Sequence, residues 1–554
     1  MESIGLNLLI FLPLLGAILV WMMPEPRGDL VKRISLWVGL AVMVIALLLW
    51  VRVLQSGPAV LVGEFSQNWI AAGDAASGDL TGRPSAVRIK YHVGLDAISG
   101  VLVALTGLLI PLSVACSFPS IHKRQREYYA WLLMLTAGMF GVFAARDVLL
   151  FYIFFEFTLV PLYFLIGIWG GSERRTAANM FFLYTFVGSV ITFAGILYLA
   201  VRAAVLTHSP TIEFDLLKLS VLSGLSATEQ SLLFLAFFAG FAIKVPFFPV
   251  HTWLPLAHTE APTAGSVLLA GVLLKLGTYG FLRFSLPMVP EGALAWSGVM
   301  GGLAVAGIIY GALVSWVQQD VKKLVAYSSV SHLGFCMLGM FSFVPVGLSG
   351  SVLYMVNHGI NTGALFLVVG MIYDRYHTRD MEKIGGLARQ MPIMAFFLVY
   401  FVLASIGLPG LNGFVSEFTV LFAAFNSTHV LGPWYGSLGA IGILLGAVYL
   451  LYMTGKVLFG PLREPDHTPD LAHVRTRDLN AREIGILLPL AVAALALGVY
   501  PRIVTDPLEP LLDAQVMRRI EGPLATRQVA MVSADSAVAP STVTHSELSG
   551  DVRP

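Results

Sequence analysis

Six ionisable side chains lie inside long apolar stretches of the sequence, where charges are rare. They are Glu156 in YIFFEFTLVP, Lys244 in GFAIKVPFFPVH, Lys275 in GVLLKLGTYG, His332 in SSVSHLGF, His358 in MVNHGINTGA and Glu417 in GFVSEFTVLF. A charge at the centre of a bilayer costs about 2.5 to 3.5 kcal/mol even on lenient insertion scales, and such residues mark ion pathways and proton relays by default. We therefore expect these six groups to carry protons.

Lys244 and Glu156 are predicted to act as a pair. A lysine beside a carboxylate in a low-dielectric medium can share or pass a proton, because burial opposes its charge while the carboxylate favours it. Lys244 lies two residues before Pro246, and a proline inside a helix frees a backbone carbonyl at a place that must face protein or water. The structural alternative is a salt bridge that joins two helices.

Three of the other four groups, Lys275, His332 and His358, also have structural alternatives. Lys275 could be satisfied by backbone carbonyls or extend towards the membrane surface, although its mid-span position makes that extension hard. His332 and His358 could be neutral imidazoles bonded across helices, but their ordinary pKa near neutrality suits a relay. Glu417 follows the interrupted stretch GLPGLNG, and the ends of half-helices are places where ions bind.

The composition is that of an integral membrane protein. Of the 554 residues, 57% are hydrophobic and 12% are charged, whereas soluble domains carry about a quarter charged residues. The net charge of +1 and the lack of a basic block give no reason to expect nucleic acid as a partner. The two cysteines, Cys116 and Cys336, lie far apart in apolar segments, which predicts neither a disulfide framework nor an iron-sulfur cluster.

Hydrophobic runs of about 18 residues or more predict membrane-spanning helices, so the fold class is an all-α polytopic membrane protein. We place fourteen spans at 4–23, 33–54, 96–118, 128–145, 148–170, 177–203, 229–250, 262–284, 293–316, 322–342, 347–373, 392–428, 433–459 and 482–500.

The distribution of lysine and arginine predicts the orientation. The loops that follow odd-numbered spans hold more than twice as many of these residues as the loops that follow even-numbered spans, and positively charged loops stay on the cytoplasmic side. Both termini should therefore face away from the cytoplasm. Only Lys244 and Lys275 fall outside the predicted loops, span ends and tail.

Two predicted spans look interrupted. The span at 229–250 contains Pro246, and the span at 392–428 is too long for one crossing and contains Pro409. Interrupted helices at corresponding places in two halves indicate a transport site between inverted repeats. Aligning the two prolines makes spans 4–8 and 9–13 two inverted five-helix repeats, with helices 7 and 12 discontinuous.

The chain is predicted to have five parts. Residues 55–92 should form an outer loop with a short hairpin, and residues from 520 onward are polar and rich in small residues, which is typical of disorder. The parts are 1–127 with the first three spans and the outer loop, 128–284 and 293–459 as the two repeats, 460–519 with a cytoplasmic loop and the last span, and 520–554 as the tail.

Several polar residues at span ends are given simpler roles. His251 and His258 lie seven residues apart in a predicted loop with no further ligand pattern, so they are expected to line the cytoplasmic mouth and not to bind a metal. Asp147, Glu260 and Asp320 are expected to cap helices or to be solvated. No glycine-rich phosphate-binding motif is present, so nucleotide chemistry should take place in another chain.

Four longer stretches carry a resemblance to a known family. They are REYYAWLLMLTAGMFGVFAARDVLLFYIFFEFTLVPLYFLIGIWGG, AIKVPFFPVHTWLPLAHTEAPTAGSVLLAGVLLKLGTYGFLRF, DVKKLVAYSSVSHLGF and GLPGLNGFVSEF. These stretches resemble the antiporter-like subunit M of bacterial NADH:quinone oxidoreductase, respiratory complex I, over roughly residues 90 to 500. The outer loop and the tail depart from the family, and Phe155 stands where the family more often has tryptophan.

The resemblance implies a fourteen-helix subunit that translocates protons, driven by quinone reduction in other subunits. It implies Glu156 and Lys244 as the channel pair, Lys275 and His332 as the central connection, and Glu417 as the outlet, with His358 a weaker match. NADH, FMN, iron-sulfur clusters and quinone would bind in partner subunits, and none in this chain. The partners would be the other membrane-arm subunits, above all the neighbouring antiporter-like ones, in the bacterial cytoplasmic membrane.

Two other classes of function remain open from the sequence. A subunit of a multisubunit cation/proton antiporter or of a membrane-bound hydrogenase would carry nearly the same row of ionisable residues. A purely structural membrane spacer would tolerate the loss of Lys244.

Overall fold

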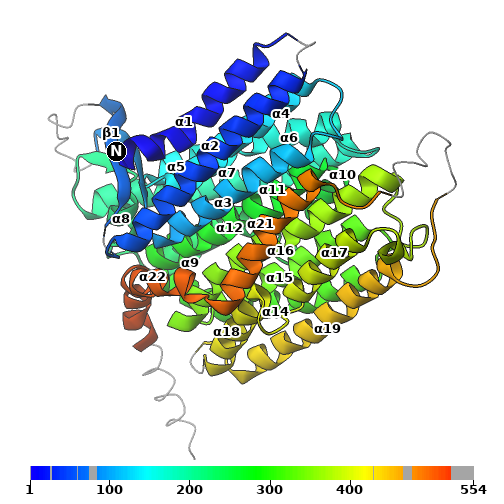
Figure 1. Cartoon of the computed structure of the whole chain (residues 1–554). Helices are drawn as coiled ribbons and strands as arrows, with labels where there is room; N and C mark the ends of the chain where they lie inside the picture. The colour runs from blue at the N-terminus through cyan, green and yellow to red at the C-terminus, as the bar shows by residue number, and fades with distance from the viewer. Residues whose placement is uncertain are drawn as a thin grey trace, which may run out of the picture.

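The structure is a computed structural model that describes residues 2–24, 28–58, 60–73, 84–427, 430–465 and 477–525. Most of these residues are helical, and the helices run side by side in one bundle (Figure 1). The first half holds α1 (Glu2–Trp21), α2 (Gly28–Gln55), α3 (Ala97–Cys116), α4 (Gln125–Ala144), α5 (Val148–Phe157), α6 (Leu159–Trp169), α7 (Arg174–Leu206), α8 (Leu216–Ser220), α9 (Ala227–Lys244), α10 (Trp253–Glu260), α11 (Thr263–Leu268), α12 (Leu274–Gly280) and α13 (Leu286–Met288). The second half holds α14 (Pro290–Trp316), α15 (Val321–Met340), α16 (Pro345–Tyr376), α17 (Pro392–Ser405), α18 (Asn412–Asn426), α19 (Pro433–Leu458), α21 (Ala481–Val499) and α22 (Arg502–Leu512).

Eleven helical stretches in the described residues are long and apolar enough to cross a membrane. They are Glu2–Trp21, Gly28–Gln55, Ala97–Cys116, Gln125–Ala144, Val148–Trp169, Arg174–Leu206, Thr263–Met288, Pro290–Trp316, Pro345–Tyr376, Pro433–Leu458 and Ala481–Val499. The protein is therefore a multi-span, mainly helical membrane protein, as the sequence predicted.

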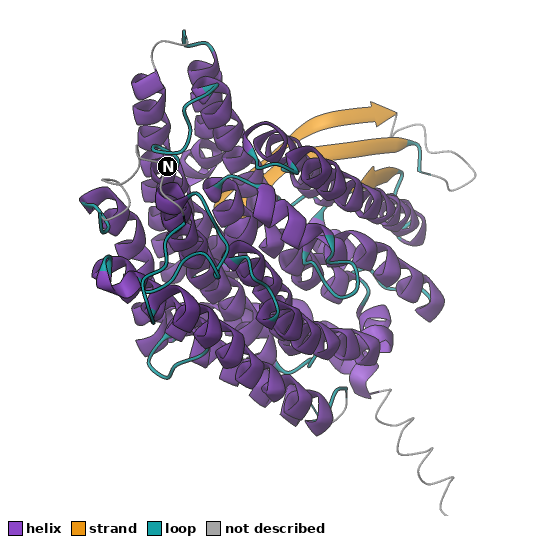
Figure 2. Cartoon of the chain, turned by 90° about the vertical axis from the view of Figure 1, so that its right-hand side faces the viewer, coloured by secondary structure: helices purple, strands orange, loops and turns teal. Residues whose placement is uncertain are grey.

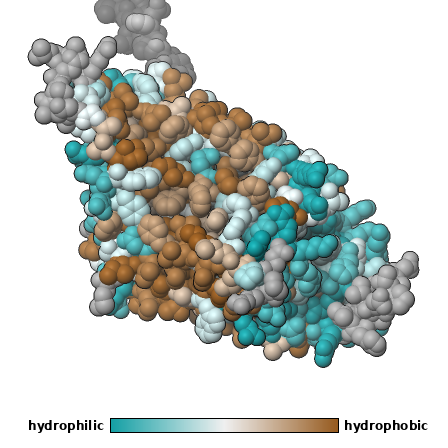
Figure 3. Space-filling view, turned by 90° about the horizontal axis from the view of Figure 1, so that it is seen from above, coloured by the Kyte–Doolittle hydropathy of each residue, from teal (hydrophilic) through white to brown (hydrophobic). Residues whose placement is uncertain are grey.

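Two helical stretches form the centre of the bundle. The most apolar windows of Thr263–Met288 and of Pro345–Tyr376 are entirely buried, whereas those of α1, α2, α7, α19 and α21 are no more than two-fifths buried. The peripheral helices expose leucine, valine and phenylalanine side chains, and hydrophobic side chains form a broad band on the face seen in Figure 3. A helix that is apolar on every face is enclosed by protein or by lipid, so this pattern distinguishes the protein core from the lipid-facing rim.

A small sheet covers one end of the bundle (Figure 2). The strands β1 (Val62–Gly73) and β2 (Ala86–Leu95) pair antiparallel, and β3 (Thr211–Glu213) pairs parallel with β2. The predicted hairpin in the outer loop is confirmed, but a strictly all-α fold is wrong for this segment. The strand β1 contains Phe65, Trp69 and Ile70, residue types that favour a pleated surface.

A buried cluster of charges anchors the end of the bundle that carries the sheet. Asp96 accepts hydrogen bonds from Arg146 at 2.9 Å and from Arg283, and all three side chains are buried. The two guanidinium groups hold the pKa of the Asp96 carboxyl well below its usual range, against the opposing effect of burial. The sequence analysis treated Arg146 and Arg283 as ordinary cations of loops or span ends. That was wrong, because each forms an ion pair with the same buried carboxylate.

Two helices are interrupted, as predicted, but the first is longer than expected. Residues 245–252 separate α9 from α10, and residues 406–411 separate α17 from α18. The segment that follows Pro249 was predicted to be a loop, whereas it forms the second half-helix, α10. Pro246 and Pro249 lie between the half-helices. Their missing N–H groups therefore remove no hydrogen bond from the interior of a helix.

The predicted disorder of the tail from residue 520 is wrong for its first residues. The amphipathic α22 and a π-helical turn, Asp513–Met517, continue as helix to residue 525, and Ile520 is buried. Apolar residues at helical spacing, among them Leu508, Leu512 and Val516, pack against the bundle and stabilise this segment. The rest of the predicted tail, residues 526–554, lies outside the described residues.

We predict that the sheet is held more firmly in acid. His92 of β2 lies 3.0 Å from a Glu64 oxygen through Nε2 and 3.6 Å from an Asp215 oxygen through Nδ1. The interaction with Asp215, helped by Glu64, raises the pKa of His92 above its ordinary value despite partial burial. This stabilisation is complete below about pH 6.5, the ordinary pKa of histidine, and is lost as the pH rises through the folded-state pKa.

The measurement is hydrogen exchange of residues 86–95 at pH 6 and pH 8, corrected for intrinsic rates. Protection should be higher at pH 6, and His92→Gln should remove the difference between the two pH values. His208→Gln, which changes an exposed histidine near the same end of the bundle, should leave the difference in place. Equal protection of the unaltered protein at both pH values would contradict the prediction.

Candidate functional site

Lys244 lies at the last residue of α9 with its ammonium group buried in the protein. Its Nζ donates one long hydrogen bond, 3.5 Å, to the Thr158 hydroxyl. The same atom lies 5.0 Å from the ring centre of Phe155 and 5.7 Å from that of Phe181. The negative end of the α9 dipole and the two aromatic faces favour the cation, but they satisfy few of its three hydrogen-bond donors.

The break after α9 is compensated by specific donors. Phe247 N–H donates to the Ala242 carbonyl at 2.8 Å, and the indole Nε1 of Trp253 donates to the Ile243 carbonyl at 2.9 Å. A buried carbonyl without a partner costs about 1 to 3 kcal/mol, so these two bonds stabilise the interrupted geometry. The break therefore holds Lys244 at a helix end without leaving the neighbouring carbonyls unpaired.

Glu156 lies close to Lys244 but makes no direct ion pair with it among the described residues. The two groups interact electrostatically, and Thr158, which bonds Lys244, lies two residues after Glu156 at the junction of α5 and α6. The Glu156 side chain is half-buried, and its Oε1 has no hydrogen-bond partner in the described part of the chain. The predicted pair is thus adjacent and open, not a closed salt bridge.

Lys275 is enclosed in the central helical stretch Thr263–Met288. Its Nζ donates to the Ala270 carbonyl in a π-helical turn, Leu269–Leu273, and lies 2.7 Å from Nδ1 of His358 on α16. A π-helical turn changes the carbonyl pattern of a helix and is common at functional sites. The two central helices therefore meet through a buried lysine-histidine contact.

His332 connects α15 to two tyrosines and a carboxylate. Its Nδ1 lies 2.8 Å from the Tyr354 hydroxyl and 3.9 Å from Glu417 Oε1, while Nε2 lies 3.2 Å from the Tyr449 hydroxyl. The Tyr354 hydroxyl donates to Glu417 Oε1 at 3.2 Å. Tyr354 thus bridges the imidazole and the carboxylate, and all four side chains are buried.

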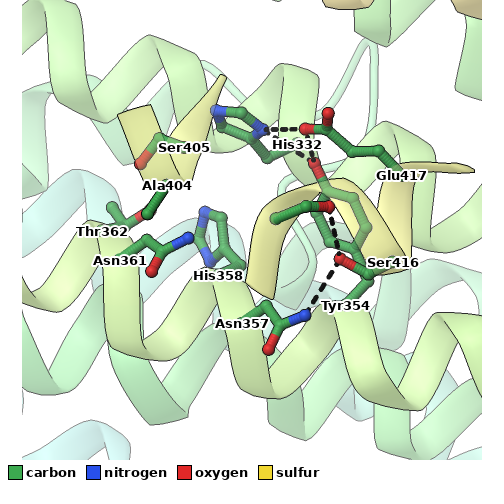
Figure 4. A pocket seen from close by; sticks show the side chains of 11 residues that line it. His332, Tyr354, Asn357, His358, Asn361, Thr362, Ala404, Ser405, Ser416 and Glu417 are labelled. Carbon is green, nitrogen blue, oxygen red and sulfur yellow. Dashed lines mark hydrogen bonds and ion pairs between the residues drawn. The ribbon is translucent and has the colours of Figure 1, made fainter. Parts of the chain in front are cut away.

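A small cavity lies between the two histidines and the second helix break. Its volume is about 10 Å³, about the room that one water molecule needs. In Figure 4, His332, Tyr354 and Glu417 lie on one side and His358 on the other. The lining residues are His332, Tyr354, Asn357, His358, Asn361, Thr362, Ala404, Ser405, Gly413, Ser416 and Glu417.

The break between α17 and α18 makes room for Glu417. Gly407 lies in that break with φ +76°, and a Cβ on it would lie 2.4 Å from Glu417 Oε2. Asn357 of α16 donates to the Asn412 carbonyl at 2.7 Å and to Ser416 Oγ at 3.1 Å. The break is thus fastened to the central helix, which fixes the position of the carboxylate.

The structure divides the six predicted residues into two groups. The first group is Glu156 with Lys244, and the second is Lys275, His358, His332 and Glu417. No hydrogen bond or ion pair of the described residues joins the two groups, although α9 and α12 pack closely: a Cβ on Gly277 would lie 2.7 Å from the Phe241 carbonyl oxygen, and one on Gly280 would lie 2.6 Å from the Phe241 ring. Within the second group, Lys275 contacts His358, His332 reaches Glu417 through Tyr354, and the small cavity lies between the two histidines.

Sequence reasoning missed the tyrosines of the second group. Tyr354 precedes His358 by four residues on α16, so the two share a helix face, and this spacing was a usable signal. Tyr449 on α19 gave no signal in the sequence, because tyrosines are common in membrane helices. Its contact with His332 depends on packing between segments that are distant along the chain.

His258 was placed in a loop, and that prediction was wrong. It lies in α10, fully buried, with its ring stacked on Phe366 at 4.7 Å. Neither ring nitrogen has a hydrogen-bond partner in the described residues, and the imidazole is close enough to interact electrostatically with Lys275. The capping roles expected for Asp147 and Asp320 are confirmed, because their side chains accept hydrogen bonds from the first amides of α5 and α15.

The comparisons with known proteins agree with this arrangement. Residues 145–441 match the family described as NADH:quinone oxidoreductase/Mrp antiporter, transmembrane. NADH-quinone oxidoreductase subunit M of Rhodobacter capsulatus is 41% identical over 513 residues, which cover 91% of this chain and 95% of that protein. The chain belongs to this family of antiporter-like membrane subunits. Subunit M of Pseudomonas aeruginosa is 39% identical over 511 residues, covering 90% and 94% of the two chains.

Solved structures give the same assignment at the level of the fold. A chain of respiratory complex I from Thermus thermophilus superposes with a TM-score of 0.79 at 30% identity, covering 93% of this chain and 99% of that one. A chain of the Mrp complex from Dietzia sp. DQ12-45-1b superposes with a TM-score of 0.75 at 21% identity, covering 94% and 99%, which shows the fold alone. The subunits of complex I and of Mrp complexes thus share this helical architecture.

We predict that the indole N–H of Trp253 stabilises the break beside Lys244. Trp253→Phe keeps a large aromatic ring but leaves the part-buried Ile243 carbonyl without its partner, which should lower the free energy of unfolding by about 1 to 3 kcal/mol. The measurement is the thermal midpoint of the purified protein in detergent. Trp296→Phe is the matched control, because that indole bonds a serine hydroxyl from a half-buried position. A smaller effect at Trp253 than at Trp296 would contradict the prediction.

Proposed function

We propose that this chain is the proton-translocating membrane subunit of an NADH:quinone oxidoreductase, coupled to quinone reduction in other subunits. The observation that carries the proposal is the second buried group, in which Lys275 contacts His358 and His332 contacts Tyr354 and Glu417. Each member of this series can gain, lose or pass on a proton. A redox centre is not needed in this chain, because NADH, FMN, iron-sulfur clusters and quinone would belong to partner subunits.

The hydrogen bonds around Tyr354 can reverse. When Glu417 is ionised, the Tyr354 hydroxyl donates to the carboxylate and accepts from His332 Nδ1–H. When Glu417 is protonated, the carboxylic acid donates to the tyrosine oxygen and the tyrosine donates to the imidazole. The passage of one proton from the histidine to the carboxylate therefore needs only small movements of hydrogen.

The gap between the two histidines is the place for one water molecule. The His332 and His358 ring centres are 5.9 Å apart, and both side chains line the small cavity. When the Lys275 ammonium donates to His358 Nδ1, the proton of that imidazole resides on Nε2, which has no protein partner among the described residues. As a water in the cavity accepts this proton and passes it to the His332 side, the Lys275 ammonium transfers a proton to His358 Nδ1, so the imidazole stays neutral and the lysine becomes neutral.

Lys244 and Glu156 form the controlling pair. The ammonium has one long hydrogen bond in the described structure, so a change in the charge of Glu156 shifts the balance between a charged and a neutral lysine. Because Glu156 is half-exposed, a neighbouring antiporter-like subunit can reach it and alter its charge. Moving one proton against 100 mV costs about 2.3 kcal/mol. The interaction between nearby charges in a low-dielectric site is large enough to supply this energy.

The proposal includes fourteen spans in two inverted five-helix repeats. Support comes from matched aspartates at the start of predicted spans 5 (148–170) and 10 (322–342), which contain α5 and α15. Asp147 caps α5 and pairs with the backbone at Asp215, and Asp320 caps α15 and pairs with the backbone at Asp380. Asp147 lies at the end of the bundle with the sheet, and Asp320 lies at the opposite end. Matched caps at opposite ends are what inversion predicts.

We place the end without the sheet at the cytoplasm and both termini on the outer side, because the cationic loops gather at the end opposite the sheet. Lys123, Arg174 and Lys323 lie in those loops or at the helix ends beside them. The partners are then the other membrane-arm subunits of the complex, in the bacterial cytoplasmic membrane.

We expect Lys244→Ala to abolish most NADH-driven proton uptake. Removing the buried ammonium removes the group that holds the incoming proton, whereas the exposed Lys383 has no role in the path, so Lys383→Ala should behave as the unaltered complex. The measurement is proton uptake and NADH oxidation in membrane vesicles that contain the assembled complex.

Full pumping with unchanged NADH oxidation in the Lys244→Ala complex would refute the channel role and favour a structural spacer. Replacing sodium by potassium in the same vesicles tests the antiporter alternative. We expect no change in uptake, and a strict dependence on sodium would favour a cation/proton antiporter.

Gly407 provides a sharper test of Glu417, because Gly410 is a natural control. Both glycines have positive φ, +76° and +96°, but a Cβ on Gly407 would meet the Glu417 carboxylate whereas one on Gly410 would meet nothing within 4 Å. Gly407→Ala and Gly410→Ala should carry a similar backbone cost of about 1 to 3 kcal/mol. Proton uptake per NADH oxidised should fall in Gly407→Ala only. Equal pumping by the two variants would show that Glu417 is not part of the proton path.

A further inference from the structure

A basic hollow lies at the end of the bundle opposite the sheet. Its volume is about 670 Å³, and it is formed by the loop between α3 and α4 together with the segment that joins α6 to α7. Its lining residues are Ser120, Ile121, His122, Lys123, Arg124, Gly167, Ile168, Trp169, Gly170, Arg174 and Arg175. The hollow therefore gathers four permanent cations and a histidine from the loop between α3 and α4 and from the start of α7.

Three of these cations are without a carboxylate partner. Arg124 pairs with Glu127, but Lys123, Arg174 and Arg175 make no ion pair in the described part of the chain. Like charges that converge without counter-ions repel one another, which an anion between them would relieve. Guanidinium groups bind phosphate oxygens through two parallel hydrogen bonds, and lysine adds a further donor.

The surrounding structure holds these groups in place. The Trp169 indole donates to the Lys123 carbonyl at 2.9 Å, its ring lies under the Arg124 guanidinium at 6.0 Å, and Tyr128 packs edge-on against it at 5.2 Å. At the start of α7, the Glu173 N–H donates to the Glu260 carboxylate at 2.8 Å, and the Glu173 side chain makes no capping bond to the next amides of this 33-residue helix. A helix start of this kind favours an anion.

An apolar surface continues from the hollow along α7. Arg175 shares a helix face with Phe186 and Val190, which are eleven and fifteen residues further on. Phe186, Val190 and their neighbour Leu183 are 43%, 43% and 58% exposed. A charged rim above an exposed apolar helix matches a molecule with an anionic head and long apolar tails. Trp169 lies at the junction, the level that tryptophan favours in membranes.

We propose that this hollow binds the phosphate headgroup of an anionic phospholipid in the cytoplasmic leaflet, with its acyl chains against α7. The headgroup phosphate lies between Lys123, Arg174 and Arg175. The site is separate from the proton path, and a lipid held there would lie beside the helix that contributes Phe181 to the surroundings of Lys244.

The test uses the intact complex in nanodiscs of phosphatidylcholine that contain a phosphatidylglycerol with a photoactivatable group in its acyl chain. Cross-links are mapped by peptide analysis. The unaltered complex should be labelled on residues 182–190, and the double variant Arg174→Gln, Arg175→Gln should lose at least about nine-tenths of that labelling. Arg33→Gln is the matched control, because Arg33 is an exposed cation near the start of α2, at the same end of the bundle, and it should keep full labelling. NADH oxidation at the unaltered rate shows that each variant is folded.

Four results would overturn the proposal. Equal labelling of the double variant would show that the cations do not hold the lipid, and equal labelling by a phosphatidylcholine carrying the same group would show that the charge is irrelevant. Labelling that is absent in the complex but appears in the isolated subunit would assign the hollow to an acidic surface of a neighbouring subunit. Addition of 10-fold excess inorganic phosphate should leave the labelling unchanged, and its loss would assign the site to free phosphate.

Discussion

The structure depends on keeping ionisable groups inside a low-dielectric interior without leaving them wholly unpaired. An isolated ammonium in such a medium is too costly to persist, and the contact between Lys275 and His358 shows how the protein manages that cost. The imidazole accepts from the lysine, and a carbonyl of a π-helical turn accepts beside it. The two helices that supply these groups are the most deeply buried in the bundle, so the rest of the fold encloses this contact.

Interrupted helices solve the same problem at the two ends of the proposed path. A continuous membrane helix uses all of its carbonyls internally, and it would offer Lys244 only apolar surroundings. The break after α9 places the lysine at a negative helix end, and the freed carbonyls are satisfied by Phe247 and Trp253. The break before α18 makes room for a carboxylate, because Gly407 has no side chain and leaves the space that the Glu417 carboxylate occupies.

Other buried charges stabilise the structure. Asp96 with its two arginines locks the end that carries the sheet, and the Arg375–Glu483 pair joins α16 to α21. These ion pairs are closed and well bonded, as buried pairs must be when they serve structure. Lys244 and Glu156 are close together but unpaired among the described residues, and this contrast separates a functional pair from a structural one.

The sequence by itself determined the membrane class, the two helix breaks, the hairpin and the six ionisable residues of the proposed path. It did so because charges and prolines in apolar runs are costly, and each one is visible without any knowledge of packing. Only the tertiary structure decided that the six residues form two groups, that Tyr354 and Tyr449 flank His332, and that Arg146 and Arg283 share Asp96. Those contacts join residues that are tens to hundreds of positions apart, and the order of residues along one chain does not specify which helix faces meet. The same reason explains the half-helix α10, since a short segment after two prolines becomes helical only when the surrounding helices bury its apolar face.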